Sequence, residues 1–492
     1  MTISPVVRRA FLILSLLLLP TAVYWNTISY RFGFRDDYSI LREAHEEPGK
    51  IFRVCSAMAR PIYGYLLEQT FGRLEGVDAF ARMRLLTALL LGIVALLLFS
   101  VLRSQGWDEW IAAMLAAVVT MLPGAQVLVA WSIAWPPALA LAFAVAAYGC
   151  AEKAFSGAAP AVRLGAWVLS LALIVGSTLN YQAACLFYLV PLAAGLLIRP
   201  ESWGRETGPW LARHAVTFGC GLAVAATIML RAYASGAIGI SPRVALSPHI
   251  GQTLEWFFRF PLPNALALFS LDGVGTNPGP YYATVVFMTI LLLAGIASIW
   301  RKHGWRHGLF AALITLSLPI AAHGAILIST ERLATYRTLM PLRGLILVLA
   351  AATLARIAGR KVTLGMMGAL TLATAWLAHR DPFDLIALPQ SYELKLIEEG
   401  ARQVNPSRPT KVFVITPALA DAPSSVRVGD EFGSLATNSD WVPKEMFGVA
   451  VREIFGKTRV SYTFESGPKL PRDRQFDVVV DMRRLREFQA TE

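Results

Sequence analysis

Apolar runs alternate with short polar connections over the first three quarters of the chain. Many of them approach the roughly 17 to 25 residues that an α-helix needs to cross a bilayer. The runs lie at residues 10–25, 83–102, 110–129, 133–150, 164–178, 182–198, 215–230, 282–300, 309–328, 345–357 and 363–378. This pattern predicts a polytopic membrane protein with about eleven transmembrane helices.

Basic residues follow the connections in a regular alternation. Short cytoplasmic loops hold an excess of Lys and Arg, so such residues indicate sidedness. The residues on the same side as Arg8 are Arg103, Lys153, Arg163, Arg199, Arg205, Arg213, Arg301, Lys302, Arg306, Arg356, Arg360 and Lys361. Because the first run lacks a small-residue cleavage site, we interpret it as a retained anchor with a cytoplasmic N-terminus. An odd helix count then places the C-terminus on the opposite, extracytoplasmic side.

The pattern changes after about residue 380. An amphipathic helix is predicted at 392–404, a second helix at 443–454, and strands at 411–416, 459–464 and 476–480. We therefore predict a transmembrane domain, residues 1–379, and a small α/β extracytoplasmic domain, residues 380–492. The transmembrane domain has three predicted periplasmic loops, long ones at 26–82 and 231–281 and a short, charge-dense one at 329–343.

Composition agrees with this architecture. The 492 residues are 55% hydrophobic and only 16% charged, with a mean hydropathy of +0.52. The net charge of +12 is spread over the connecting loops, which indicates topology and contact with lipid headgroups rather than a nucleic-acid surface. Three of the four cysteines fall inside apolar runs, and no disulfide framework or Cys/His metal spacing is visible.

An acidic pair, Asp36 and Asp37, follows the first apolar run. Ionised carboxylates beside hydrocarbon are costly unless they have a partner or a function. The pair is therefore a candidate catalytic site, and the alternative is a solvated helix cap.

Arginines on the same side could hold a phosphate. Transfer from a lipid phosphate to a hydroxyl needs a carboxylate that accepts the hydroxyl proton and cations that stabilise the departing phosphate. The planar fork of arginine suits the second task. The candidates are Arg60, Arg332, Arg337 and Arg343. Each of them could instead extend to a lipid headgroup.

Neutral and acidic residues complete the candidate site. Tyr and Gln side chains could orient a sugar, although Tyr at a membrane boundary is also ordinary. The candidates for substrate contact are Tyr38, Tyr63, Tyr181, Gln182 and Tyr336. A divalent metal, Mg²⁺ or Mn²⁺, could bind at Asp36, Asp37, His45 and Glu46. The alternative is a solvated loop, and no other cofactor is indicated.

Four stretches resemble one known family. Arg35-Asp36-Asp37-Tyr38 follows the first helix, Arg60-Pro61 lies in the same loop, and Tyr181-Gln182 stands at the mouth of a helix. The segment from Asp430-Glu431-Phe432-Gly433-Ser434 through Trp441-Val442-Pro443 also looks like pieces of the tail domains of such enzymes. The chain is thus similar to GT-C class glycosyltransferases that use polyprenyl-phosphate sugars, in particular the serotype-converting glucosyltransferases of bacterial surface polysaccharide.

The resemblance implies an inverting transfer at the periplasmic face of a bacterial inner membrane. The donor would be a polyprenyl-phosphate-linked sugar, the acceptor a hydroxyl of a glycan or glycolipid, and the base Asp36 or Asp37. Three other classes stay open, one of them a non-catalytic scaffold whose C-terminal domain binds a cell-wall polymer. A lipid-linked oligosaccharide flippase would more often carry charged residues in mid-helix, whereas here polar residues collect at helix ends. A surface-polysaccharide polymerase or ligase would use a diphosphate-linked polymer as donor.

Overall fold

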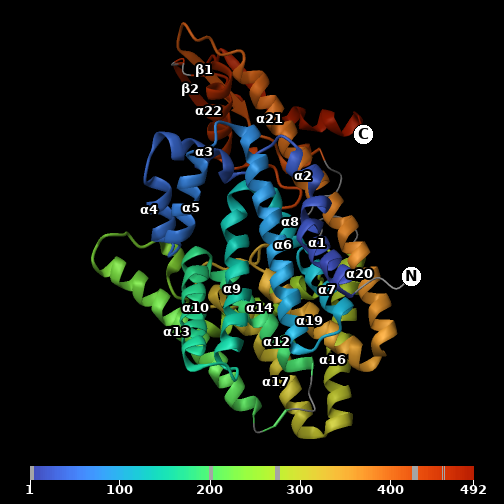
Figure 1. Ribbon diagram of the computed structural model, residues 1–492. Helices are drawn as coiled ribbons and strands as arrows, with labels where there is room; N and C mark the ends of the chain where they lie inside the picture. The colour runs from blue at the N-terminus through green and yellow to red at the C-terminus, as the bar shows by residue number, and fades with distance from the viewer. Residues whose placement is uncertain are drawn as a thin grey trace.

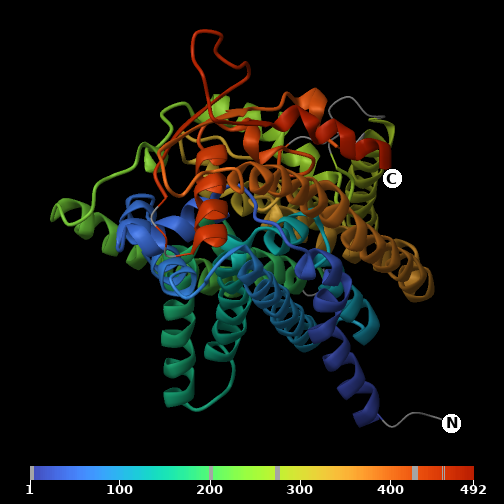
Figure 2. The same cartoon turned by 90° about the horizontal axis from the view of Figure 1, so that it is seen from above.

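The computed structural model describes residues 5–198, 203–204, 206–271, 278–423, 430–456, 458 and 460–491. Long helices form a bundle, and the C-terminal region with its strands covers one end of that bundle (Figure 1). We name this the upper end, as it stands in Figure 1, and the opposite end the lower end. Seen from above, the C-terminal elements overlap the bundle rather than standing apart from it (Figure 2).

Helices account for most of the described chain. They are α1 (Pro5–Val23), α2 (Trp25–Ser29), α3 (Asp36–Glu46), α4 (Lys50–Ala57), α5 (Pro61–Phe71), α6 (Phe80–Gln105), α7 (Glu109–Val119), α8 (Pro123–Ala130), α9 (Trp135–Ala154), α10 (Pro160–Asn180), α11 (Gln182–Cys185), α12 (Leu189–Ile198), α13 (Thr207–Ala234), α14 (Ile250–Arg259), α15 (Pro261–Leu266), α16 (Gly279–His303), α17 (Trp305–Ala322), α18 (Gly324–Leu327), α19 (Met340–Ile357), α20 (Gly359–Pro382), α21 (Leu388–Ala401) and α22 (Val442–Phe455).

All eleven apolar runs fall on these helices. By length and composition, eight of the described helices can cross a membrane, or nine if the bent pair α7–α8 counts as one span. The segment Gln182–Ile198 is a shorter apolar helix. The predicted membrane-helix architecture is therefore confirmed, whereas the count of eleven stays a prediction.

The sequence predicts one helix at 110–129, but the structure has two shorter helices there. The run breaks between α7 and α8 with a bend of 50°. Pro123 opens α8, and the preceding Leu122 is extended (φ −63°, ψ 157°), as expected before proline. The 3₁₀ segment η2 (Ser132–Ala134) then joins α8 to α9. The end of this broken span thus places the buried backbone N–H groups of Ser132 and Ile133 against Asp37.

Ion pairs bring several basic connections together. Arg8 pairs with Glu109 at 2.8 Å, and Arg360 pairs with Asp108 at 2.7 Å. The start of α1, the start of α7 and the α19–α20 connection therefore meet at one end, as the alternation of basic residues predicts. Arg199 and Arg205 lie outside the described residues.

The C-terminal region has the predicted α/β content. Strands β1 (Thr410–Ile415), β2 (Tyr462–Gly467) and β3 (Val478–Asp481) form a parallel sheet in the order β2-β1-β3. The strand predicted at 459–464 begins later, at Tyr462, and residue 459 lies outside the described residues. α20 passes into α21 through the π-helical turn η6 (Phe383–Ala387). Position 380 therefore lies inside a continuous helix, and the proposed domain boundary there stays a prediction.

Charge pairs hold the C-terminal region on the upper end. Arg31 contacts Asp78 at 2.6 Å, Glu398 of α21 at 2.5 Å and Glu453 of α22 at 2.8 Å. Arg42 of α3 contacts Glu445 of α22 at 2.5 Å. α3, which carries the acidic pair, is thus fixed against α22.

Candidate active site

The two adjacent aspartates have different environments. Asp37 is 0% exposed. Its carboxylate accepts hydrogen bonds from the backbone N–H groups of Phe34 (2.9 Å), Ser132 (3.3 Å) and Ile133 (3.0 Å). Burial raises the pKa of Asp37 to about 7, although these hydrogen bonds favour the ionised form. Asp37 thus joins the start of α3 to η2, and its hydrogen-bonding capacity is used within the protein.

Asp36 is only half-buried, and its carboxylate has no hydrogen-bond partner among the described residues. Burial raises its pKa, while the positive charges of Arg337, Arg35 and Arg243 act in the opposite direction. The preceding Arg35 has a positive φ of 44°, a conformation that costs energy and is frequent at functional sites. Of the two aspartates, Asp36 is therefore the one whose carboxylate is available for chemistry.

Among the arginines that act on the Asp36 carboxylate, Arg337 has the largest effect. Its guanidinium lies over the ring of Trp131, 4.2 Å from the centroid. Its Nε is 3.6 Å from a carboxylate oxygen of Glu431, and 24% of its side chain is exposed. The charge of Asp36 acts on Arg337 together with the phenols of Tyr181 and Tyr63. The structure therefore brings an unpaired acid and a partly exposed cation into one region.

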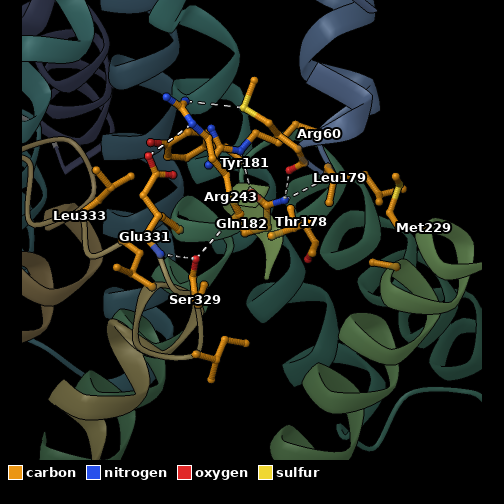
Figure 3. Close-up of a pocket in the computed structure, with 18 of the residues that line it drawn as sticks. Arg60, Thr178, Leu179, Tyr181, Gln182, Met229, Arg243, Ser329, Glu331 and Leu333 are labelled. Atoms are coloured by element: carbon orange, nitrogen blue, oxygen red, sulfur yellow. Dashed lines mark hydrogen bonds and ion pairs between the residues drawn. The ribbon is translucent and has the colours of Figure 1, made fainter. Parts of the chain in front are cut away.

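A cavity of about 370 Å³ opens beside Arg337. One part of its wall is polar and contains Arg60, Tyr181, Gln182, Arg243, Glu331 and Arg337. Another part is apolar and contains Leu179 of α10 and Leu222, Ala225 and Met229 of α13. Figure 3 shows the polar side chains gathered together, with Met229 to one side on α13. Asp36 does not line the cavity, but Arg337 and Arg243 of its wall act on the Asp36 carboxylate.

Arg60 forms one polar corner of the cavity. Its Nε donates to Oε1 of Gln182 at 2.9 Å, and its guanidinium lies 4.7 Å from the ring centroid of Tyr181. The amide of Gln182 also donates to the carbonyl of Ala59 at 2.8 Å, and Ala59 has a positive φ of 59°. Tyr63 stands behind this corner, its ring 6.4 Å from that of Tyr181 and its hydroxyl donating to the Ile133 carbonyl at 3.1 Å.

Two loops that line the cavity bond to one another. Leu246 and Ser329 form an antiparallel bridge, and the Thr330 N–H donates to the Ala245 carbonyl at 2.9 Å. Arg243 and Glu331 form an ion pair at 3.3 Å across these loops. Sequence reasoning missed both residues of this pair as site residues, because only the folded loops bring them together.

Two predicted phosphate ligands do not reach the cavity. Arg332 is exposed and is not part of its lining. Arg343 is buried in α19, where it donates to the Asn264 carbonyl at 2.8 and 3.2 Å. Of the three arginines predicted from this region, Arg337 alone lines the cavity, together with Arg243 from another loop. The phosphate-binding role of each arginine stays a prediction.

Two of the tyrosines predicted to contact substrate, Tyr38 and Tyr336, are buried. The Tyr38 ring is fully buried, and its hydroxyl bonds with the backbone of Gly33 at 3.1 and 3.3 Å. Tyr336 is 4% exposed, and its ring packs edge-on against Phe432 with the centroids 5.1 Å apart. Both rings are thus held inside the protein, away from the cavity lining.

The four predicted metal ligands do not share one site. Two of them bond to other groups of the protein. His45 bonds to the Leu74 carbonyl at 2.8 Å, and Glu46 pairs with Arg42 at 3.4 Å. Within the part of the chain that the structure describes, no three His, Cys, Asp or Glu side chains are grouped to hold a metal. The structure therefore does not bring Asp36, Asp37, His45 and Glu46 together as one metal site, and a metal requirement stays a prediction.

Comparisons with known proteins give distant similarities. No protein-family model and no curated protein matches the sequence. Among solved structures, ArnT from Cupriavidus metallidurans bound to undecaprenyl phosphate is 11% identical, with 93% of this chain and 90% of that chain covered and a TM-score of 0.45. An oligosaccharyltransferase from Archaeoglobus fulgidus, in complex with Zn and sulfate, is 13% identical, with coverages of 94% and 62% and a TM-score of 0.44.

Proposed function

We propose that this protein is a glycosyltransferase of a bacterial inner membrane. It takes a sugar from a polyprenyl-phosphate donor and attaches it to a hydroxyl of a glycan or glycolipid. The reaction takes place at the upper end of the bundle, which we assign to the periplasm. The observation that carries this proposal is the juxtaposition of the unpaired Asp36 carboxylate with Arg337 and Arg243, two cations on the wall of one cavity.

The cavity suits a donor with one polar and one apolar part. Its volume of about 370 Å³ lies in the range of ligand sites, roughly 300–1,000 Å³. The apolar wall comes from α10 and α13, and only 22% of the membrane-spanning window of each helix is buried in the protein. The polyprenyl chain of the donor could therefore lie in the bilayer along these helices while its phosphate group reaches the arginines.

The chemistry follows from the charges. The acceptor oxygen attacks the anomeric carbon of the donor sugar while Asp36 takes the hydroxyl proton. The bond from the anomeric carbon to the phosphate oxygen breaks, and its electron pair leaves with polyprenyl phosphate. Arg337 and Arg243 stabilise the charge that develops on this phosphate. A single displacement inverts the configuration at the anomeric carbon. Tyr181, Gln182 and Arg60 form the adjoining polar corner, where they can orient the sugar.

Substitution of Asp36 tests the proposal. Asp36→Asn keeps the shape of the side chain but removes its basicity, so transfer should fall by about 10²-fold or more. The assay follows release of polyprenyl phosphate from a labelled polyprenyl-phosphate sugar, with a cell-envelope glycan and glycolipid extract as acceptor. The exposed Asp440 supplies the control variant, Asp440→Asn, which should keep full activity.

Two results would contradict the proposal. Full transfer by Asp36→Asn would exclude Asp36 as the base. Consumption of a polyprenyl-diphosphate oligosaccharide in place of the monophosphate sugar would instead indicate a polymerase or ligase.

A further inference from the structure

A short segment of the C-terminal region reaches the arginine of the candidate site. The backbone N–H of Tyr336 donates to Asp430 at 3.2 Å and to Glu431 at 3.3 Å. Phe432 packs on the ring of Tyr336, and the Gly433 N–H donates to the Leu385 carbonyl at 2.8 Å. The segment 430–433 is therefore fixed between the loop that carries Arg337 and the turn between α20 and α21.

Glu431 of this segment faces Arg337 without completing a hydrogen bond. Glu431 is 1% exposed, and its Oε1 is 3.6 Å from Nε of Arg337. Among the described residues, neither of these two buried atoms has a hydrogen-bond partner. A distance of 3.6 Å is too long for a hydrogen bond, and unsatisfied buried polar atoms are costly. Glu431 thus faces Arg337 as a counter-charge but leaves the Nε–H group of Arg337 without an acceptor.

A phosphate group can supply the hydrogen-bond acceptor that the Nε–H group of Arg337 lacks. Its oxygens can receive two N–H groups of one guanidinium, whereas Glu431 receives none from Nε. A phosphate at the cavity wall and an ionised Glu431 would both approach Arg337, and the two anions would repel one another. The two therefore compete for the same cation.

We propose that Glu431 is a positioning residue that holds Arg337 as a substitute anion until the phosphate of the lipid donor takes its place. This inference rests on the proposed function, because it takes the lipid phosphate as the competing ligand. It assigns to the C-terminal region a direct effect on donor affinity. Competition with Glu431 weakens donor binding. In return, Glu431 orients Arg337 and compensates its charge before the donor arrives.

The environment of Glu431 supports such an exchange. Burial, followed by the hydrogen bond and charge of Asp430, raises the pKa of Glu431 well above its usual range, while Arg337 acts in the opposite direction. Arg343 of α19 also interacts with both acids. An approaching phosphate adds another negative charge, which raises the pKa of Glu431 further, so that Glu431 takes up a proton and the repulsion is removed.

The experiment measures binding of polyprenyl phosphate to the full-length protein in phosphatidylcholine nanodiscs. Glu431→Gln keeps an oxygen for the Tyr336 N–H but removes the competing charge, so binding should tighten by about tenfold. Asp430→Asn should act in the opposite direction, because loss of the neighbouring negative charge favours ionised Glu431. In Arg337→Gln, the effect of Glu431→Gln should disappear. The exposed pair of Glu465 with Arg474 supplies the matched control, Glu465→Gln, with unchanged binding.

The outcomes separate this inference from the proposed function. If the unmodified protein binds polyprenyl phosphate and Arg337→Gln weakens binding, but Glu431→Gln binds equally or more weakly, the role of Glu431 is excluded and the proposed function stands. If Glu431→Gln does not fold, weaker binding by Asp430→Asn still supports the inference, and unchanged or tighter binding overturns it. If the unmodified protein does not bind polyprenyl phosphate, or binds added phosphatidylglycerol equally well, both proposals fail.

Discussion

Two polar clusters at opposite ends of the bundle differ in how completely their hydrogen bonds are formed. At the lower end, one carboxylate oxygen of Glu152 in α9 accepts from His214 Nε2 at 2.6 Å, Trp210 Nε1 at 2.9 Å and the Tyr148 hydroxyl at 3.1 Å. The other ring nitrogen of His214 bonds to the Tyr188 hydroxyl at 2.8 Å. This network links α9, α13 and the segment before α12, and each of these ring nitrogens and hydroxyls and the indole N–H has a partner.

The cluster at the upper end is incomplete. Among the described residues, Asp36 has no hydrogen-bond partner for its carboxylate, and Arg337 Nε, Glu431 Oε1, Trp131 Nε1 and Ser132 Oγ are buried without partners. Such atoms lower stability unless something else compensates for them. A matched network indicates a structural role, whereas an incomplete one beside a cavity leaves hydrogen-bonding capacity for a substrate.

The sharpest test of this contrast lies within the acidic pair. Asp37→Ala would leave three buried backbone N–H groups, those of Phe34, Ser132 and Ile133, without an acceptor. At about 1–3 kcal/mol for each unsatisfied group, we expect a loss of roughly 3 kcal/mol or more in the free energy of unfolding. Thermal unfolding and the yield of monodisperse protein in detergent would measure this loss.

Asp36→Ala is the matched control for that experiment. It removes the neighbouring carboxylate, which has no hydrogen bond to lose, so the unfolding temperature should stay close to that of the unmodified protein. Equal destabilisation by the two variants would show that the division between a structural and a chemical aspartate is wrong.

A smaller loss of stability is expected at the lower end. Glu152→Ala removes the acceptor of His214, Trp210 and Tyr148. Because 38% of the Glu152 side chain is exposed, water can satisfy part of this demand, and we expect a cost of about 1 kcal/mol. Thermal unfolding would detect the shift, and Glu152→Gln, which keeps an acceptor oxygen, should show less of it. Transfer by the folded protein should not change. A loss of transfer in Glu152→Ala at full stability would contradict a structural role for this network.

Much of the architecture follows from local patterns. Apolar runs of membrane length define helices regardless of their neighbours, because backbone groups in lipid must be satisfied within the segment. The bend before Pro123 also has a local cause. The strands at 411–416 and 476–480 were predictable from buried β-branched residues, and the structure has them at Thr410–Ile415 and Val478–Asp481.

The site was only partly predictable. Arg60, Tyr181, Gln182 and Arg337 do line one cavity, as expected of polar residues at helix ends on one side. Nothing in the sequence distinguishes Asp36 from Asp37, since the difference is the contact of Asp37 with η2, about a hundred residues away. Arg343 is equally ambiguous, because its partner, the Asn264 carbonyl, belongs to a distant helix. These assignments depend on tertiary contacts that no local pattern contains.

The acid dependence of transfer provides the finest test of the upper cluster. Asp36 accepts a proton only in its ionised form, so kcat/KM for the donor should fall as the pH decreases through the pKa of Asp36. Burial raises this pKa, and the acid limb should therefore have its midpoint above the usual aspartate range, roughly pH 3.9. Arg243 lowers the same pKa through its positive charge.

Arg243→Gln should consequently move the acid limb to higher pH. The shift should be a fraction of a pH unit, because 61% of the Arg243 side chain is exposed and water and salt screen its charge. Arg474→Gln, which changes an exposed arginine of the C-terminal region, should leave the limb in place. The interpretation is wrong if the acid limb of Arg243→Gln stays in place or moves to lower pH. The group that titrates in the reaction would then not be an Asp36 carboxylate that interacts with Arg243.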